Sequence, residues 1–159
     1  QTPSIYENLS VFQNLEVSFP EGRSVFGALG FKCTDTVKDR VKAVAVEIGL
    51  ADKLDTEAGL LSHGQKQWLE IGMLLAQEPK LLLVDEPVAG MTDVETAQTA
   101  ELLKEINRDK TIIVVEHDMT FVRELGVKVT CLHEGHAIAE GTIDQVSSNE
   151  RVIEVYLGR

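Results

Sequence analysis

The sequence predicts an α/β fold built around a parallel sheet, and two observations indicate it. Residues 81–84 form a short, uninterrupted apolar run between Pro79 and Pro87, which is typical of a strand buried on both faces of a parallel sheet. A second apolar run covers residues 111–115 and predicts another buried strand, and segments with helical spacing lie on either side of both runs. Strands and helices therefore alternate along the chain, as they do in α/β proteins.

A helix is predicted from Ser62 to a point near Glu78. Ser62 and Gln65 have the spacing of a capping box, in which the serine side chain accepts from a first-turn amide and the glutamine reaches back. Pro79 ends the helix because the residue before a proline avoids the helical conformation. A helix N-terminus presents unpaired amides with a partial positive charge, and Gly64 leaves room for an anion to approach them. We therefore expect this helix end to hold an anion.

The region before this helix is predicted to be helical in three places. A capping box at Ser10 begins a helix that ends before Pro20. A short apolar piece over residues 21–30 is also expected to be helical. Residues 35–48 carry apolar positions at helical spacing, and Gly49 is placed to end that helix.

The rest of the chain is predicted to continue with alternating elements. These are a helix over residues 93–108, a strand over 111–115, a helix over 119–125 that ends at Gly126, a hairpin of strands over 127–132 and 137–140, and short helices that begin at Thr142 and Asn149. In the first of these helices the side chains expected to face inward are Val94, Ala97, Leu102, Leu103 and Ile106. The turn of the hairpin is expected at Glu134 and Gly135.

The composition is that of an ordinary globular domain, with 43% apolar and 26% charged residues. Neither a membrane span nor a signal peptide is expected from the pattern of apolar residues, and we expect a cytosolic protein. The formal charge of −11 disfavours binding to nucleic acid, which relies on clustered lysine and arginine. Cys33 and Cys131 lack metal-site spacing and are expected to be free thiols.

Several motifs resemble those of the ATP-binding cassette (ABC) ATPases. The sequence LSHGQKQ, which begins at Leu61, resembles their signature motif, and LLLVDEP, which begins at Leu81, resembles their Walker B strand. AGMT, which ends at Thr92, resembles the D-loop, although the family usually has aspartate at this last position. His117 resembles the switch histidine and Gln1 the glutamine of the Q-loop. The resemblance spans the whole chain.

The resemblance implies roles in ATP hydrolysis for four residues. Asp85 would hold Mg²⁺ through water, and Glu86 would act as the general base that orients the attacking water. His117 would contact the γ-phosphate, and Gln1 would bridge Mg²⁺ and the attacking water. Without the resemblance, Asp85 and Glu86 would be an acidic pair that caps a helix or loop, and His117 a hydrogen-bonded core imidazole.

A second group of residues is implied to act on a nucleotide held by another subunit. In the resembled family, the residues that correspond to Ser62, Gly64 and Gln65 contact the ATP of the opposite subunit, so the site is completed in trans. Asp93 lies in the D-loop region and is implied to be near the nucleotide. His63 departs from the glycine that the family usually has at its position.

The P-loop sequence G-x-x-x-x-G-K-[ST] occurs nowhere in the chain. In the resembled family it precedes the Q-loop and grips the β- and γ-phosphates, so the chain alone is expected to bind ATP weakly or not at all. The resemblance implies an incomplete P-loop NTPase fold of the ABC type, with half of the parallel-sheet core and a helical subdomain. Residues 1–61 would form the Q-loop segment and the helical subdomain. Residues 62–159 would carry the signature helix, Walker B strand, D-loop, switch histidine and C-terminal core.

The implied function is that of the ATP-binding subunit of an ABC importer for urea or branched-chain amino acids, with ATP and Mg²⁺ as cofactors. Its partners would be transmembrane permease subunits and a second ATPase subunit, at the inner face of the cell membrane. One alternative is a DNA-acting cassette ATPase, which the acidic charge and the lack of sustained heptads disfavour. The other is a non-enzymatic remnant that acts as an interaction or inhibitory module.

The chain is also expected to self-associate. In the resembled fold the P-loop strand lies between the strands that correspond to residues 111–115 and 127–132. Without it each of these strands has an unpaired edge, which favours pairing with another chain. The alternative is closure of the gap within one chain.

Overall fold

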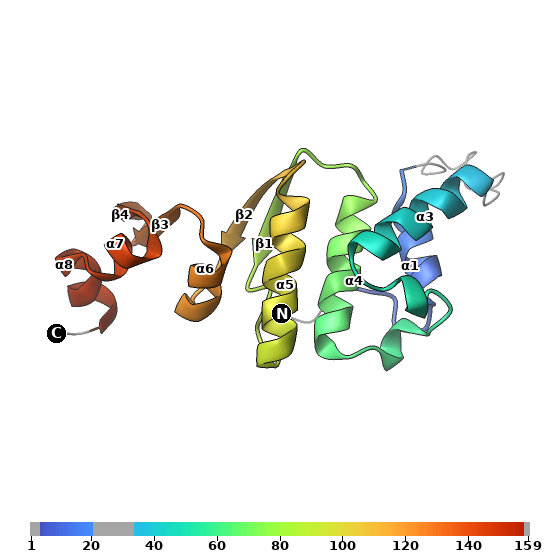
Figure 1. Ribbon diagram of the computed structural model, residues 1–159, viewed down its shortest axis with the longest axis horizontal. Coiled ribbons are helices and arrows are strands. Elements are labelled where there is room, and N and C mark those ends of the chain that lie inside the picture. The colour runs from blue at the N-terminus through green and yellow to red at the C-terminus, as the bar shows by residue number, and fades with distance from the viewer. Residues whose placement is uncertain (1–3, 21–33, 158–159) are drawn as a thin grey trace. The chain divides into compact units, whose positions relative to one another are not determined.

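The computed structural model describes residues 4–20 and 34–157, which fall into two compact units, residues 1–115 and residues 116–159 (Figure 1). Each unit has its own sheet and its own buried residues.

Three sequence-based expectations are not tested by the described residues. Gln1, Cys33 and the helix expected over residues 21–30 lie outside them. The division between residues 61 and 62 separates functional regions within the first unit, and it stays a prediction.

Three helices form one part of the first unit, namely α1 (Val11–Ser18), α3 (Asp35–Glu47) and α4 (His63–Leu75). Helix α1 contacts both of the others, and two short 3-10 helices, η1 (Ala51–Lys53) and η2 (Ala58–Leu60), lead from α3 to α4. Gly72 allows close packing, because a Cβ there would lie 2.5 Å from Ile48 Cδ1 and 3.1 Å from Leu15 Cδ2. Leu15 and Ile48 are themselves buried, so the three helices meet at this glycine.

The helix starts follow the capping residues in the sequence. Ser10 and Ser62 each form the predicted capping box, and α3 ends before Gly49, which has a φ of 70°. Helix α4 ends at Leu75, earlier than the predicted end near Glu78. The physical reason is that Glu78 adopts a left-handed φ of 52°, so the turn before Pro79 is no longer helical.

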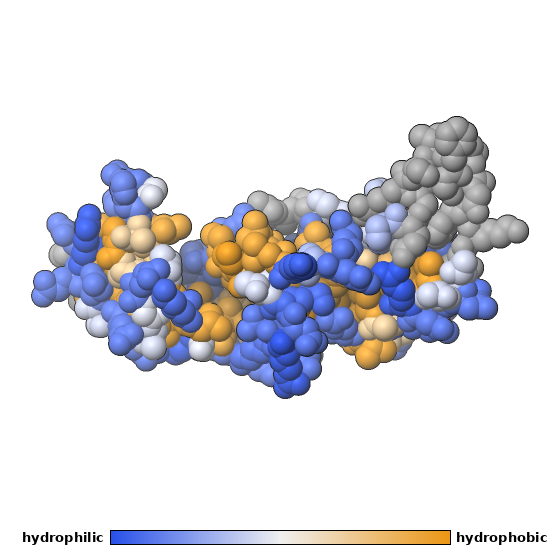
Figure 2. Space-filling view, turned by 90° about the horizontal axis from the view of Figure 1, so that it is seen from above, coloured by the Kyte–Doolittle hydropathy of each residue, from blue (hydrophilic) through white to orange (hydrophobic). Residues whose placement is uncertain are grey.

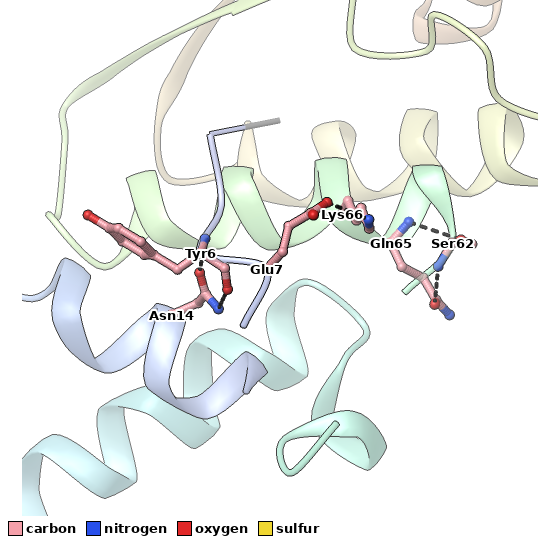
Figure 3. Close-up of polar contacts among 6 residues, drawn as sticks. All are labelled: Tyr6, Glu7, Asn14, Ser62, Gln65 and Lys66. Atoms are coloured by element: carbon pink, nitrogen blue, oxygen red, sulfur yellow. Dashed lines mark hydrogen bonds and ion pairs between the residues drawn. The ribbon is translucent and has the colours of Figure 1, made fainter. Parts of the chain in front are cut away.

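The segment that precedes α1 is held by a buried amide side chain. Asn14 Oδ1 accepts from the Tyr6 N–H at 2.8 Å, and Asn14 Nδ2 donates to the Tyr6 carbonyl at 3.0 Å (Figure 3). Lys66 of α4 reaches the same segment, with its Nζ 2.8 Å from Glu7 Oε1. Because both backbone groups of Tyr6 are satisfied, this segment is fixed against α1 and α4.

The sheet of the first unit has two parallel strands, β1 (Leu81–Asp85) and β2 (Thr111–Val115), joined through α5 (Asp93–Ile106). Leu83 lies opposite Ile113 in this pairing. The parallel pairing confirms the predicted α/β class.

Burial of both faces, predicted for β1, is wrong, and none of the residues of β2 is fully buried, although a buried strand was predicted there. Leu82 and Val84 are buried. The side chains on the other face are exposed, to 47% for Leu81, 68% for Leu83, 50% for Ile113 and 61% for Val115. Within the described residues the core covers one face only, so side chains alternate between the core and the solvent. We call the exposed side chains of Leu81, Leu83, Ile113 and Val115 the open face.

Helix α5 ends at Ile106, two residues before its predicted end, and of the five side chains expected to face inward only Leu103 and Ile106 are fully buried, while Ala97 and Leu102 are half-buried. Ala100, Leu103 and Ile106 are buried with the spacing of one helix face. Val94 was expected to face inward but is 67% exposed. It precedes Leu103 by about two and a half turns, so it lies on the opposite side of the helix.

The second unit contains α6 (Met119–Leu125), the hairpin of β3 (Val129–His133) and β4 (His136–Gly141), α7 (Ile143–Ser147), α8 (Glu150–Val152) and η3 (Ile153–Leu157). Its buried side chains include Phe121, Ile143, Val146 and Val152. Glu134 and Gly135 form the predicted turn with φ values of 46° and 79°, the left-handed pair that suits a two-residue hairpin loop. Helix α6 ends at Gly126, with a φ of 66°, as predicted.

The described residues form two separate sheets, β1 with β2 and β3 with β4. Hydrophobic side chains reach the surface in several patches among hydrophilic ones (Figure 2). None of the helices described has the length and hydropathy needed to cross a membrane.

We expect the chain to self-associate through the open face, because exposed apolar surface of this kind favours association. Leu83→Lys combined with Ile113→Lys puts two charges on this face and should shift the chain towards the monomer. Light scattering at micromolar concentration measures the change.

The matched control is Val46→Lys combined with Val94→Lys, which alters two exposed valines outside the open face. Equal association of both double variants would show that another surface is responsible. A monomeric wild-type chain would contradict the expectation.

Candidate functional site

The N-terminal turn of α4 is built by a capping box. Ser62 Oγ accepts from the Gln65 N–H at 3.2 Å, and Gln65 Oε1 accepts from the Ser62 N–H at 3.1 Å (Figure 3). Gly64 lies between them and is buried. The predicted helix start is confirmed, and the three signature residues share one turn.

A carboxylate from α5 occupies this helix end. Glu95 Oε1 accepts from the Ser62 hydroxyl at 2.7 Å, and Glu95 also accepts a hydrogen bond from the Gly64 backbone. Its Oε2 accepts from the Thr92 N–H at 3.1 Å and from the Thr92 hydroxyl at 3.0 Å. The bond from the Thr92 backbone, followed by that from Ser62, holds the pKa of Glu95 below its ordinary value. One anion is thus shared by the N-termini of two helices.

Thr92 begins α5 at the position where the resembled family usually has aspartate. Its Oγ1 accepts from the Glu95 N–H at 3.3 Å, which makes Thr92 the N-cap of α5. Threonine and aspartate both supply a side-chain oxygen for this role, so the departure preserves the cap. Asp93 follows as an exposed residue in the first helical turn.

His63 joins the signature turn to the loop between β1 and α5. Its Nε2 lies 3.0 Å from the Ala89 carbonyl oxygen, to which the ring N–H donates. The ring also lies against Gly90, where a Cβ would be 3.7 Å from it and where φ is 73°. A glycine at position 63, which the family usually has, would lack this ring N–H. The hydrogen bond to Ala89 therefore depends on the histidine that is found in this chain.

Asp85 and Glu86 lie exposed at the carboxyl end of β1, the edge at which open α/β sheets bind ligands. The Glu86 N–H donates to the Val115 carbonyl at 2.9 Å and so continues the pairing with β2. Glu86 has a φ of 47°, in the left-handed region that residues with a side chain rarely adopt. Such conformations cluster at functional sites. The chain leaves the sheet directly after Glu86.

His117 belongs to the second unit and follows the end of β2 by two residues. Its side chain is 77% exposed, which excludes the core imidazole considered from the sequence. The Glu116 side chain is only 2% exposed and accepts from the backbone N–H groups of His117 at 2.7 Å and Asp118 at 3.1 Å. Glu116 Oε2 also lies 3.6 Å from His117 Nδ1. This buried carboxylate fixes the backbone that carries the exposed imidazole.

The fit of the site to Mg²⁺ depends on Asp85. Within residues 4–20 and 34–157, no three histidine, cysteine, aspartate or glutamate side chains form a group that could hold a metal by themselves. Mg²⁺ usually keeps several waters and takes one or two carboxylates together with substrate phosphates, so an exposed aspartate at this edge fits it. The contact predicted for Gln1 lies outside the described residues.

Glu95 and Thr99 were missed by the sequence analysis. Thr92 and Glu95 have the T-x-x-E spacing of a capping box, so the first half of the signal was available. Nothing in the sequence links Glu95 to Ser62, which is 33 positions away. Thr99 Oγ1 accepts from the Trp68 indole N–H at 2.9 Å in the core and forms a second tie between α4 and α5.

Two families match the sequence. The family described as ABC transporter matches residues 1–89, which is more than half of the chain and includes LSHGQKQ and LLLVDEP. The chain belongs to the ABC transporter family. A second family, described as Branched-chain amino acid ATP-binding cassette transporter, matches residues 138–159.

Similar curated proteins are transport ATP-binding proteins. The high-affinity branched-chain amino acid transport ATP-binding protein LivG of Escherichia coli K12 is 30% identical over 158 residues, which are 98% of this chain and 62% of LivG. BraF of Pseudomonas aeruginosa, which has the same description, is 32% identical over 70% of this chain and 45% of its own length. The methionine import ATP-binding protein MetN of E. coli K12 is 36% identical over 89% of this chain and 43% of its own length. The chain therefore spans about three fifths of LivG.

Solved structures confirm the fold. An ATP-binding cassette of an ABC transporter superposes with a TM-score of 0.82 at 26% identity, covering 98% of this chain and 66% of its own. The cbiO1 protein of Clostridium perfringens, part of the transporter complex cbiONQ, gives a TM-score of 0.74 at 28% identity, with 98% and 61% covered. The ABC ATPase fold predicted from the motifs is thus confirmed.

Glu95→Ala should destabilise the first unit by about 1–2 kcal/mol at pH 7, because it removes a charged acceptor from two helix N-termini. The pKa of Glu95 is lowered in the folded protein, so its contribution is present above the pKa of an unfolded glutamate, about 4.3, and is lost as the pH falls through the folded pKa. The difference from wild type should therefore disappear in acid. Urea unfolding followed by the fluorescence of Trp68, the single tryptophan, measures it.

Glu101→Ala is the matched control on the same helix, since the exposed Glu101 side chain forms a surface ion pair with half-buried Lys104 one turn away. A Glu95→Ala variant as stable as this control at pH 7 would contradict the expectation.

Proposed function

We propose that the chain is the hydrolytic part of an ATP-binding subunit of an ABC importer for branched-chain amino acids. The observation that carries the proposal is the pair of exposed carboxylates, Asp85 and Glu86, at the carboxyl end of β1 in a chain of the ABC transporter family. The chain spans 62% of LivG, and it contains no P-loop sequence. The proposed activity therefore belongs to a protein that includes a P-loop in addition to this chain.

In that protein Asp85 and Gln1 would hold Mg²⁺, which neutralises charge on the phosphates of ATP. Glu86 accepts the proton of the attacking water and orients it towards the γ-phosphate. The left-handed backbone of Glu86 supports this role, because backbone conformations of this uncommon kind cluster at functional sites. His117 contacts the γ-phosphate, and its exposed imidazole on a backbone fixed by Glu116 is suited to that contact.

The signature turn would act on the nucleotide of the opposite subunit. The first turn of α4 combines the Ser62 hydroxyl, the small Gly64 and the unpaired amides of a helix N-terminus, and Gln65 completes its capping box. Such an arrangement suits the binding of a phosphate. Asp93 lies at the start of α5, near Thr92 and the D-loop. A second ATPase subunit is therefore a partner in this proposal.

Branched-chain amino acids are the proposed cargo because LivG and BraF carry that description and because residues 138–159 match the branched-chain family. Urea, the other cargo suggested by the motifs, has no support from these relatives. The transmembrane permease subunits would contact the helices between residues 1 and 61. The protein would then work at the inner face of the cell membrane.

The lack of a P-loop sequence favours one other role, a non-enzymatic module that binds or inhibits a complete subunit. A role on DNA is disfavoured by the formal charge of −11. The two experiments that follow separate the enzymatic and non-enzymatic roles.

Glu86→Gln in a protein that contains this chain and a P-loop should leave ATP binding intact and lower turnover at least about a hundredfold, because the nearly isosteric amide cannot accept the proton. Phosphate release and ATP binding are measured on the same preparation. Glu105→Gln, on the exposed side of α5, is the matched control and should keep full turnover. Unchanged hydrolysis by Glu86→Gln would refute the assignment.

The 159-residue chain should bind ATP with a dissociation constant in the millimolar range or weaker, and it should not hydrolyse ATP. The reason is that its sequence lacks the P-loop motif, whose amides and lysine would bind the phosphates. Calorimetry with ATP and Mg²⁺ tests this expectation. If less than one equivalent of this chain inhibited the ATPase activity of a complete subunit that has a P-loop, the result would favour the inhibitory module instead.

A further inference from the structure

Two hydrogen-bond donors of the signature turn are already bonded to Glu95. The Ser62 hydroxyl donates to Glu95 Oε1 at 2.7 Å, and the Gly64 backbone donates to the same carboxylate. The Ser62 Oγ lone pairs accept from the Gln65 N–H. The turn therefore offers no free hydroxyl proton to a second anion while Glu95 stays in place.

Gly64 leaves the space that the Glu95 carboxylate occupies. A Cβ at position 64 would lie 2.8 Å from Glu95 Oε1, 2.9 Å from its Cδ and 3.1 Å from its Cγ. All three distances are too short for an ordinary carbon contact. In this conformation the glycine accommodates Glu95, and the space that a phosphate would need is filled.

A nucleotide phosphate and the Glu95 carboxylate would also repel each other. At about 4 Å two like charges near a protein surface repel strongly enough to change a binding constant by tenfold or more. The two anions use the same donors, so they compete for them directly.

We propose that Glu95 is a resident anion that must leave the signature turn before a phosphate of the opposing subunit's nucleotide binds there. This inference rests on the proposed function of Ser62 and Gly64 and adds a regulatory step to it. Displacement of Glu95 breaks its bonds to α4 and frees both donors together.

The way in which Glu95 is bound allows this movement without unfolding. Its two oxygens are divided between the helices, with Oε1 bonded to α4 and Oε2 bonded to Thr92 of α5. The Oε2 bonds lie within its own helix and can persist when Oε1 is released. Helix α5 then keeps its capping box while α4 exchanges one anion for another.

Glu95→Gln tests the proposal. Glutamine has the same size and still completes a T-x-x-Q capping box with Thr92, but it lacks the charge. Inorganic tripolyphosphate is titrated into the 159-residue chain, and the amide resonances of Gly64 and Gln65 are followed by NMR. Glu101→Gln is the matched control, because it removes one negative charge from the same helix away from the turn.

Glu95→Gln should bind tripolyphosphate at least about tenfold more tightly than wild type and Glu101→Gln, with saturable shifts at Gly64 and Gln65. Adding Ser62→Ala to Glu95→Gln should weaken binding again, because the freed hydroxyl is lost. Trp68 fluorescence confirms that each variant is folded.

Equal affinity in wild type and Glu95→Gln, or binding by neither, overturns the proposal. Weaker binding by Glu95→Gln also overturns it, since Glu95 would then support the phosphate site. The proposed ATPase function fails separately, through unchanged turnover in Glu86→Gln, and that result does not involve Glu95.

Discussion

The carboxylate of Glu95 connects the N-terminal turns of α4 and α5, and the geometry of the candidate site depends on this connection. Helix α4 carries the signature residues, and α5 begins where the loop from Asp85 and Glu86 ends. His63 ties the same loop to α4 through the Ala89 carbonyl, and the Trp68 indole ties α4 to α5 in the core. Two polar contacts at the surface and one in the core thus make the signature turn and the carboxylate-bearing loop a single connected region.

The local features of this region could be predicted from the sequence, because each arises within a few residues. The capping box of Ser62 and Gln65 follows from side chains that bond the nearby backbone. The end of α3 before Gly49 and the hairpin turn at Glu134 and Gly135 follow from backbone conformations with positive φ, which glycine adopts readily. The position of Asp85 and Glu86 at the end of a strand follows from the apolar run before them. The family motifs add roles to these residues, which position alone does not supply.

The features that were missed depend on distant parts of the chain. The anion that α4 was expected to hold is present, but it is a side chain 33 positions from Ser62. The apolar run of β1 predicts burial on both faces, yet Leu83 is exposed because the described residues cover only one face of the sheet. Val94 was assigned inward because it is apolar, although its angular position on α5 opposes Leu103. In each case the residue type indicated what the position could do, and the contacts made in the folded chain determined what it does.

The left-handed backbone of Glu86 has a consequence for engineering the stability of this fold. A glutamate in that conformation costs about 1 kcal/mol, whereas asparagine adopts it more readily. A search for thermostabilising substitutions that considered the backbone alone would therefore select Glu86→Asn. That substitution would remove the proposed general base, so the most favourable residue for folding at this position differs from the one that hydrolysis requires. Thermal stability and catalytic competence are opposed here at a single residue.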